Sequence, residues 1–256
     1  MITNAFDSSA PLFTPETFYG PGKDLADIVL PIFSKVIFEA VRKVVPWEPI
    51  GRLHGGNGVD STRSLGMFRQ GGRRIAFYLP NIGSATCATE AFECAHVTGA
   101  KTIILFGSAG SLDEKKTAGK YVVPTAAYRD EGFSYHYAPA SDYIDVTGHT
   151  VVEEIFRELK VPYVAGPVWT TDAFYRETAQ KAEARRSEGC LAVEMEVAGM
   201  QALCDFEGLR FYDFLQTGDV LGSETYSVGA LRDANHNLDN LALALQLAER
   251  VPLTEK

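Results

Sequence analysis

Two glutamates flank a methionine where an apolar run turns into a helical pattern. Residues 190–200 read CLAVEMEVAGM, which places Glu194 and Glu196 around Met195. Buried acids need donors or a ligand, and a carboxylate at a helix N-terminus suits the vicinal hydroxyls of a sugar. A thioether offers a soft surface to the ring. These residues are candidate sugar ligands, although a capping or salt-bridged pair fits as well, and only one acid need be functional.

A glycine-rich segment, GSAG at 107–110, follows another apolar run. Glycines let backbone N–H groups approach a phosphate or other anion, and the Ser108 hydroxyl adds a donor. A tight strand-to-loop turn without a ligand explains the same residues equally well. The pattern is neither a P-loop nor GxGxxG, which argues against binding of nucleoside triphosphates or dinucleotides.

Asp219 follows the strand-like run 210–217. It could protonate a departing heterocycle if its site raises the carboxyl pKa, but spacing alone favours a turn or cap aspartate. The aromatic stretches YRDEGFSYHYAP (128–139) and TTDAFYRET (170–178) could stack a planar base, with Arg129 or Arg176 meeting an anion, or could simply pack.

No metal site or nucleophilic serine or cysteine is indicated. There is no HExxH or GxSxG motif, and no cysteine has an evident histidine mate. We therefore treat the histidines as non-metal residues: His54, His96, His136, His149 and His236.

Strand-like and helical patterns alternate along the chain, which predicts a sheet covered by helices. The expected strands are 73–79, 101–107, 119–128, 161–172, 191–195 and 210–219, and the expected helices are 85–98, 151–160, 196–208 and 229–250. The run KTIILFG is apolar at nearly every position and should be a central strand. Ligands of such sheets lie beyond the carboxyl ends of the strands, where the motifs above cluster.

Composition limits the classes of function. The 256 residues carry a net charge of −9, which argues against general affinity for nucleic acid or anionic membranes. The four cysteines form no CxxC pair and read as reduced thiols, and no run is long enough to span a bilayer. Without a linker or repeat, we expect residues 1–256 to form a single cytoplasmic domain.

The motifs NIGSAT, ILFGSAGSL, YRDEGFSYHYAP, TTDAFY, AVEMEVAG and TGD occur in this order between about residues 73 and 220. Together they resemble the nucleoside phosphorylase family, which includes uridine and purine nucleoside phosphorylases and the methylthioadenosine/adenosylhomocysteine nucleosidases. The resemblance implies a three-layer α/β/α sandwich around a mixed, partly barrel-like sheet, assembled as homodimers or homohexamers. It also implies cleavage of a nucleoside through an oxocarbenium-like sugar, without a cofactor, by inorganic phosphate as co-substrate or by water.

The resemblance assigns roles to the candidate residues. Glu196 would bind the 2′ and 3′ hydroxyls as a catalytic residue, with Met195 and Glu194 beside the ribose. Asp219 matches the catalytic aspartate that protonates the purine ring, and Phe174 and Gly110 would line the base pocket. The implied phosphate ligands are Ser108, Gly107, Gly83, Lys35 and Arg63.

Three departures from the family pattern stand out. Leu105 replaces the arginine that phosphorylases carry two residues before the first glycine of GSAG. The early glycine- and arginine-bearing loop is replaced by PIFSKV (31–36), where Lys35 is the only cation, so we expect Arg63 or Arg69 to come from a neighbouring subunit. That loop also lacks the water-activating glutamate of the nucleosidases. Thr178 and Gln180 stand where uridine phosphorylases read uracil, so the base stays open.

The leading hypothesis is a nucleoside phosphorylase, a pentosyltransferase acting on uridine or a purine nucleoside. The alternatives are a purine nucleosidase that hydrolyses methylthioadenosine-like substrates, for which Leu105 argues, and a catalytically silent nucleoside-binding relative.

Overall fold

The computed structural model describes residues 5–53, 63–222 and 225–253. The strands of these residues form one mixed sheet in the order β11-β10-β6-β8-β9-β5-β1-β4-β3-β2, and β7 pairs with β6. The strands are β1 Ile28–Pro31, β2 Trp47–Leu53, β3 Arg63–Gln70, β4 Arg73–Tyr78, β5 Thr102–Ser111, β6 Tyr121–Asp130, β7 Tyr143–Asp145, β8 Tyr163–Thr171, β9 Ala192–Glu194, β10 Arg210–Leu221 and β11 Tyr226–Ser227.

The helices alternate with the strands along much of the chain. They are α1 Pro15–Tyr19, α2 Lys35–Val44, α3 Ser84–Thr98, α4 Glu114–Thr117, α5 His149–Glu158, α6 Ala179–Ser187, α7 Val197–Glu207, α8 Leu231–His236 and α9 Leu238–Arg250, with short 3-10 turns η1 Ser134–His136 and η2 Phe174–Arg176.

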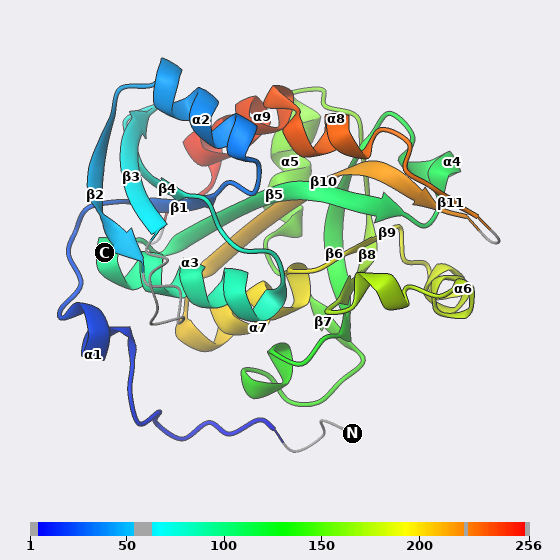
Figure 1. The fold of residues 1–256 in the computed structure, drawn as a ribbon, viewed down its shortest axis with the longest axis horizontal. Helices are drawn as coiled ribbons and strands as arrows, with labels where there is room; N and C mark the ends of the chain where they lie inside the picture. Colours follow the sequence, from blue (N-terminus) through cyan, green and yellow to red (C-terminus); the bar gives the residue numbers. More distant parts are fainter. Residues whose placement is uncertain (1–4, 54–62, 223–224, 254–256) are drawn as a thin grey trace.

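The helices cover both faces of the sheet (Figure 1). Helices α2, α5 and α9 lie on one face and α3 and α7 on the other, so the chain forms the expected three-layer α/β/α arrangement. Alternate residues of β5 reach opposite layers: Ile104 and Phe106 pack in the α2/α5/α9 layer, whereas Ile103 and Leu105 pack in the α3/α7 layer. This two-sided burial confirms that KTIILFG is a central strand.

Part of the sheet closes on itself. Strand β5 pairs with β10 on one side and β9 on the other, and the ring continues through β8 and β6 back to β10. The predicted barrel-like sheet is therefore confirmed. Strands β5 and β10 are parallel to each other, but β9 is antiparallel to β5, and β6 is antiparallel to β10.

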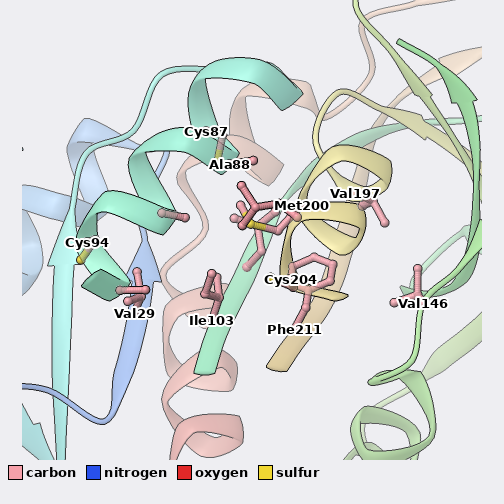
Figure 2. Packing of buried hydrophobic residues seen from close by; sticks show 14 of the residues in the cluster. Val29, Cys87, Ala88, Cys94, Ile103, Val146, Val197, Met200, Cys204 and Phe211 are labelled. Carbon is pink, nitrogen blue, oxygen red and sulfur yellow. The ribbon is translucent and has the colours of Figure 1, made fainter. Parts of the chain in front are cut away.

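Figure 2 shows how α3 and α7 pack on the sheet through buried hydrophobic side chains. Cys87 of α3 and Met200 and Cys204 of α7 are buried above Ile103 of β5 and Phe211 of β10. The helices approach closely at Gly199, where an added Cβ would lie 2.5 Å from the Ser84 Cβ. All four cysteines are free and buried, as their expected role as core thiols requires.

The structure corrects four expectations from the sequence. The GSAG segment is not a loop, because β5 continues through Ser111. Asp219 lies inside β10, beside a bulge between Thr217 and Asp219, rather than after the strand. The expected helix 229–250 is two helices, α8 and α9, separated at Asn237. The motif-bearing strand ends also do not share one edge, since β6, β8 and β9 run opposite to β5 and β10.

The helix ends at Gly99 and Gly208 are as predicted. Both glycines adopt left-handed backbone angles after α3 and α7. None of the helices in the described ranges is long and apolar enough to cross a membrane.

Candidate active site

A cavity of about 980 Å³ opens where β5, β9 and β10 meet η2 and α8. It collects most of the residues singled out in the sequence: Gly107, Ser108, Gly110, Phe174, Glu194, Met195, Glu196 and Asp219 all line it. Strands far apart in sequence thus bring the predicted sugar, anion and base residues to one place. A cavity of this size with a few polar groups is typical of a small-molecule site.

Glu196 is positioned by the start of α3. The backbone N–H of Gly83 donates to Glu196 Oε1 over 2.6 Å, and Ser84 Oγ donates to the Met195 carbonyl over 3.0 Å. Gly83 has φ +101°, a conformation that favours glycine, so its N–H can turn toward the carboxylate. Burial raises the pKa of Glu196 to about 7, while the hydrogen bond from Gly83 opposes that shift.

The Glu194 carboxylate accepts hydrogen bonds from other groups of the protein. Its Oε2 accepts hydrogen bonds from the backbone N–H groups of Glu196 at 2.6 Å and Val197 at 2.7 Å, and its Oε1 accepts one from the Thr170 hydroxyl. This carboxylate caps the first turn of α7. Burial, followed by the charge of Glu196, raises the pKa of Glu194 to about 8. Of the two acids, Glu196 therefore has the freer oxygen to offer a ligand.

The GSAG segment faces the cavity as an extended strand. Ser108 Oγ donates to Asn235 Oδ1 of α8, which ties the predicted anion-binding serine to a helix on the far wall. Leu105 also lines the cavity and is 2% exposed, so an apolar side chain occupies the place of the family arginine. Ser34, the N-cap of α2, adds a second hydroxyl and bonds His236 Nδ1 at 2.8 Å.

Three of the predicted phosphate ligands do not reach the cavity lining. Lys35 is exposed at the start of α2. Arg63 Nε pairs with the fully buried Glu90 at 2.7 Å, and its Nη1 donates to the Leu79 carbonyl. The Gly83 N–H donates to the Glu196 carboxylate and not toward the predicted phosphate position. Among the described residues, the lining holds no lysine, arginine or histidine.

Glu90 also binds Asn81, at the start of the NIGS segment. Its two oxygens accept hydrogen bonds from the backbone and side-chain N–H groups of Asn81, each at 2.9 Å. The Arg63–Glu90 pair therefore fixes the NIGS segment that carries Gly83.

Asp219 lies opposite Gly110 in the β5–β10 pairing, and Val193 of β9 pairs with the same glycine on the other side of β5. An added Cβ at Gly110 would come 2.5 Å from Leu221 Cδ1 and 3.3 Å from Asp219 Oδ2, so the glycine leaves room for both side chains. Burial raises the pKa of Asp219, and a hydrogen bond from Tyr226 partly offsets this effect. A carboxyl group whose pKa is raised holds its proton to higher pH than an exposed aspartate, which favours a role as a general acid.

Aromatic and acidic side chains form the wall beside Asp219. Phe174 and Tyr175 line the cavity with their rings 4.1 Å apart, and Glu177 follows them. Burial raises the pKa of Glu177 to about 7, with the Asp219 charge as the next cause. The other predicted anion ligands, Arg129 and Arg176, are not part of the lining.

Sequence reasoning missed several residues of the cavity. In the segment 31–36 the charge of Lys35 predicted an anion ligand, whereas the neighbouring Ser34 carried no comparable signal. Asn235 lies in the segment 229–250, for which the sequence predicted a helix and no ligand contact. Glu177 follows Phe174 by three residues in the TTDAFYRET stretch, so its closeness to the predicted base-binding aromatic was a signal that the sequence did contain.

The described part of the chain contains no group of three or more histidine, cysteine, aspartate or glutamate side chains that could hold a metal. His54 lies outside the described residues.

Comparison with known proteins gives the family. Residues 47–251 match the family model described as the phosphorylase superfamily. A purine nucleoside phosphorylase DeoD-type from Myxococcus xanthus (strain DK1622) is 28% identical over 251 residues, covering 93% of this chain and 99% of the relative. A DeoD-type purine nucleoside phosphorylase from Yersinia enterocolitica is 27% identical, covering 87% of this chain and 91% of the relative.

A guanosine phosphorylase from Halorubrum lacusprofundi is 33% identical over 135 residues, covering 50% of this chain and 54% of the relative. The family match extends over most of the chain and includes every predicted site residue except Lys35. The chain therefore belongs to the phosphorylase superfamily.

Proposed function

We propose that the protein is a purine nucleoside phosphorylase, a pentosyltransferase that cleaves the N-glycosidic bond of a purine nucleoside with inorganic phosphate. The observation that carries this proposal is the shared cavity of Glu196, Ser108 and Asp219. One carboxylate for sugar hydroxyls, a hydroxyl-bearing strand for an anion and a second carboxyl for the base are the parts such a transfer needs. Two full-length relatives bear the name purine nucleoside phosphorylase.

Each group has a defined task in this proposal. Glu196 accepts hydrogen bonds from the 2′ and 3′ hydroxyls, and Met195 contacts the ribose. Asp219 donates its proton to the purine ring as the C1′–N bond breaks, so that the base leaves neutral. Phosphate, held at Ser108 and Gly107, bonds to C1′ of the oxocarbenium-like sugar and gives ribose 1-phosphate.

The anion needs a cation that the described cavity lining does not include. We propose that a second copy of the chain supplies it, with Arg69 as the better donor, because Arg69 is exposed whereas Arg63 is paired with Glu90. A homo-oligomer would then be required for phosphorolysis. Loss of phosphate affinity on dilution to monomer, measured by sedimentation and rate together, tests this requirement; unchanged affinity in the monomer contradicts it.

Hydrolysis is the second candidate, because Leu105 and the absence of a cation in the described lining favour water over phosphate as the acceptor. The same binding groups would serve, and free ribose would replace ribose 1-phosphate.

A product panel separates these functions. Inosine, guanosine, adenosine, methylthioadenosine and uridine are each incubated with and without phosphate, and base and sugar products are quantified. Cleavage of purine nucleosides with equal amounts of base and ribose 1-phosphate supports the proposal. Phosphate-independent free sugar identifies a nucleosidase, cleavage of uridine alone refutes the purine assignment, and binding without products identifies a silent relative.

A further inference from the structure

Glu177 is an acid of the cavity for which the proposed reaction has no use. It lies directly after η2, next to the aromatic pair Phe174 and Tyr175, and it lines the same cavity as Asp219. Glu177, Asp219 and Tyr226 all line this cavity, the Asp219 charge raises the pKa of Glu177, and the charges of both acids raise the pKa of Tyr226, so the three side chains lie near one another. This end is the one at which Asp219 would meet the base.

The nearest cation does not neutralise Glu177 by direct pairing. Lys181, one turn into α6, pairs through Nζ with Asp130 at 2.8 Å and lies 5.9 Å from the Trp169 ring centre. Its charge only moderates the pKa of Glu177, behind burial and Asp219. In the part of the chain that the structure describes, the cavity therefore presents acidic acceptors without a basic side chain among its lining residues.

A half-buried carboxylate in such a wall needs hydrogen-bond donors from its ligand. In the proposed reaction the sugar hydroxyls bind Glu196, which leaves Glu177 to the donors of the base. A purine presents an amino donor at position 2 or position 6, and a 6-oxopurine adds the ring N1–H, so only the amino group differs between guanosine and inosine or between adenosine and purine riboside. Aromatic rings on the same wall hold the base plane next to the acid.

We propose that Glu177 determines base specificity, favouring purine nucleosides whose base carries an exocyclic amino group over those that lack it. This inference rests on the proposed function, since it concerns the base end of the same cavity. A site built to pair with a polar group rejects the analogue that lacks it, because the buried acceptor is then left without a partner. A charge-assisted hydrogen bond of this kind corresponds to a preference of about 10–100-fold.

Two substrate pairs isolate the amino group. Guanosine and inosine differ only in the 2-amino group, and adenosine and purine riboside differ only in the 6-amino group. Dissociation constants by calorimetry and kcat/KM are measured for all four at pH 8, where the Glu177 carboxyl is ionised. The proteins are the wild type, Glu177→Ala, Glu177→Gln and the control Glu183→Gln, which removes a charge from the exposed face of α6.

The wild type and Glu183→Gln should prefer the amino-bearing member of at least one pair by about 10-fold or more. Glu177→Ala should bring that ratio close to one, and Glu177→Gln, which keeps a neutral acceptor, should fall between. A ratio near one in the wild type, or a ratio unchanged in Glu177→Ala, overturns the inference. Selective binding without phosphorolysis would refute the proposed function alone, whereas phosphorolysis without selection would refute only this role of Glu177.

Discussion

The backbone N–H of Gly83 donates to the carboxylate of Glu196 over 2.6 Å, and this bond joins the start of α3 to the start of α7. It holds one carboxylate oxygen of a side chain that lines the cavity. The two acids at this strand–helix junction differ in their contacts: Glu194 caps the helix, and Glu196 is held by Gly83 at the cavity.

Glu196→Ala should lose most activity. It removes the only charge-assisted contact proposed for the ribose hydroxyls, which corresponds to about 2–4 kcal/mol of transition-state binding in kcat/KM. Glu207→Ala, at the opposite end of α7 and outside the cavity, is the matched control. Turnover close to wild type in a folded Glu196→Ala protein would exclude Glu196 from the site.

Gly83→Ala tests the hydrogen bond itself. A side chain at φ +101° introduces strain of about 1–3 kcal/mol and moves the N–H that holds Glu196. Gly189→Ala introduces comparable strain at φ +94°, after α6 and away from the cavity. Both variants should melt a few degrees lower, but only Gly83→Ala should lower kcat/KM at a temperature where both are folded. Equal activities of the two variants would show that the Gly83 bond does not position Glu196.

The pH dependence of kcat/KM should be bell-shaped. Glu196 must be ionised to accept two hydroxyls, and burial raises its pKa to about 7, so the rate rises as pH increases through that value. Asp219 must be protonated to donate, so the rate falls as this carboxyl group loses its proton, and burial moves its pKa upward from the ordinary value. In Glu196→Gln the rising limb should disappear, and in Asp219→Asn the falling limb should disappear. A profile with both limbs in either variant contradicts the assignment to that residue.

Asp213 should affect stability rather than activity. It is 2% exposed, it does not line the cavity, and within residues 5–53, 63–222 and 225–253 neither of its buried carboxyl oxygens accepts a well-formed hydrogen bond. Burial, with the charges of Glu194 and Glu196, raises its pKa well above the ordinary value, so the folded state keeps a proton that the unfolded chain releases. Stability therefore falls as pH rises between the two pKa values.

Asp213→Leu replaces the acid by an apolar side chain of the same shape. The free energy of unfolding should rise by about 1–3 kcal/mol near neutral pH, and the decline in melting temperature from pH 6 to pH 9 should become shallower. Calorimetric melts over that range measure both effects. A lower melting temperature at every pH would mean that the carboxyl group has a stabilising partner in the folded protein.

The sequence predicted the strand–helix alternation from residue 73 onward because β4 and β5 contain long buried apolar runs and the strands after them are separated by helical patterns. The hairpin of β2 and β3 gave a weaker pattern, since much of β2 is exposed and Pro49 interrupts it. The mixed strand directions of the barrel could not be read from the chain, because pairing between β5, β9 and β10 depends on contacts distant in sequence.

The same distinction applies to the site. Glu196, Ser108 and Asp219 lie in motifs whose residue types indicate chemistry. The different contacts of Glu194 and Glu196 depend on Thr170 and Gly83, which lie on other elements, so the spacing of the two glutamates could not predict these contacts. The pairing of Arg63 with Glu90 could not be predicted either, because the two residues are distant in the sequence.

The most direct test of phosphorolysis is the amount of ribose 1-phosphate formed per purine base released by the wild-type protein, measured by phosphorus NMR as phosphate is varied. We predict one ribose 1-phosphate per base and a rate that falls to background without phosphate. Base release that continues without phosphate and yields free ribose would contradict the assignment of a phosphorylase.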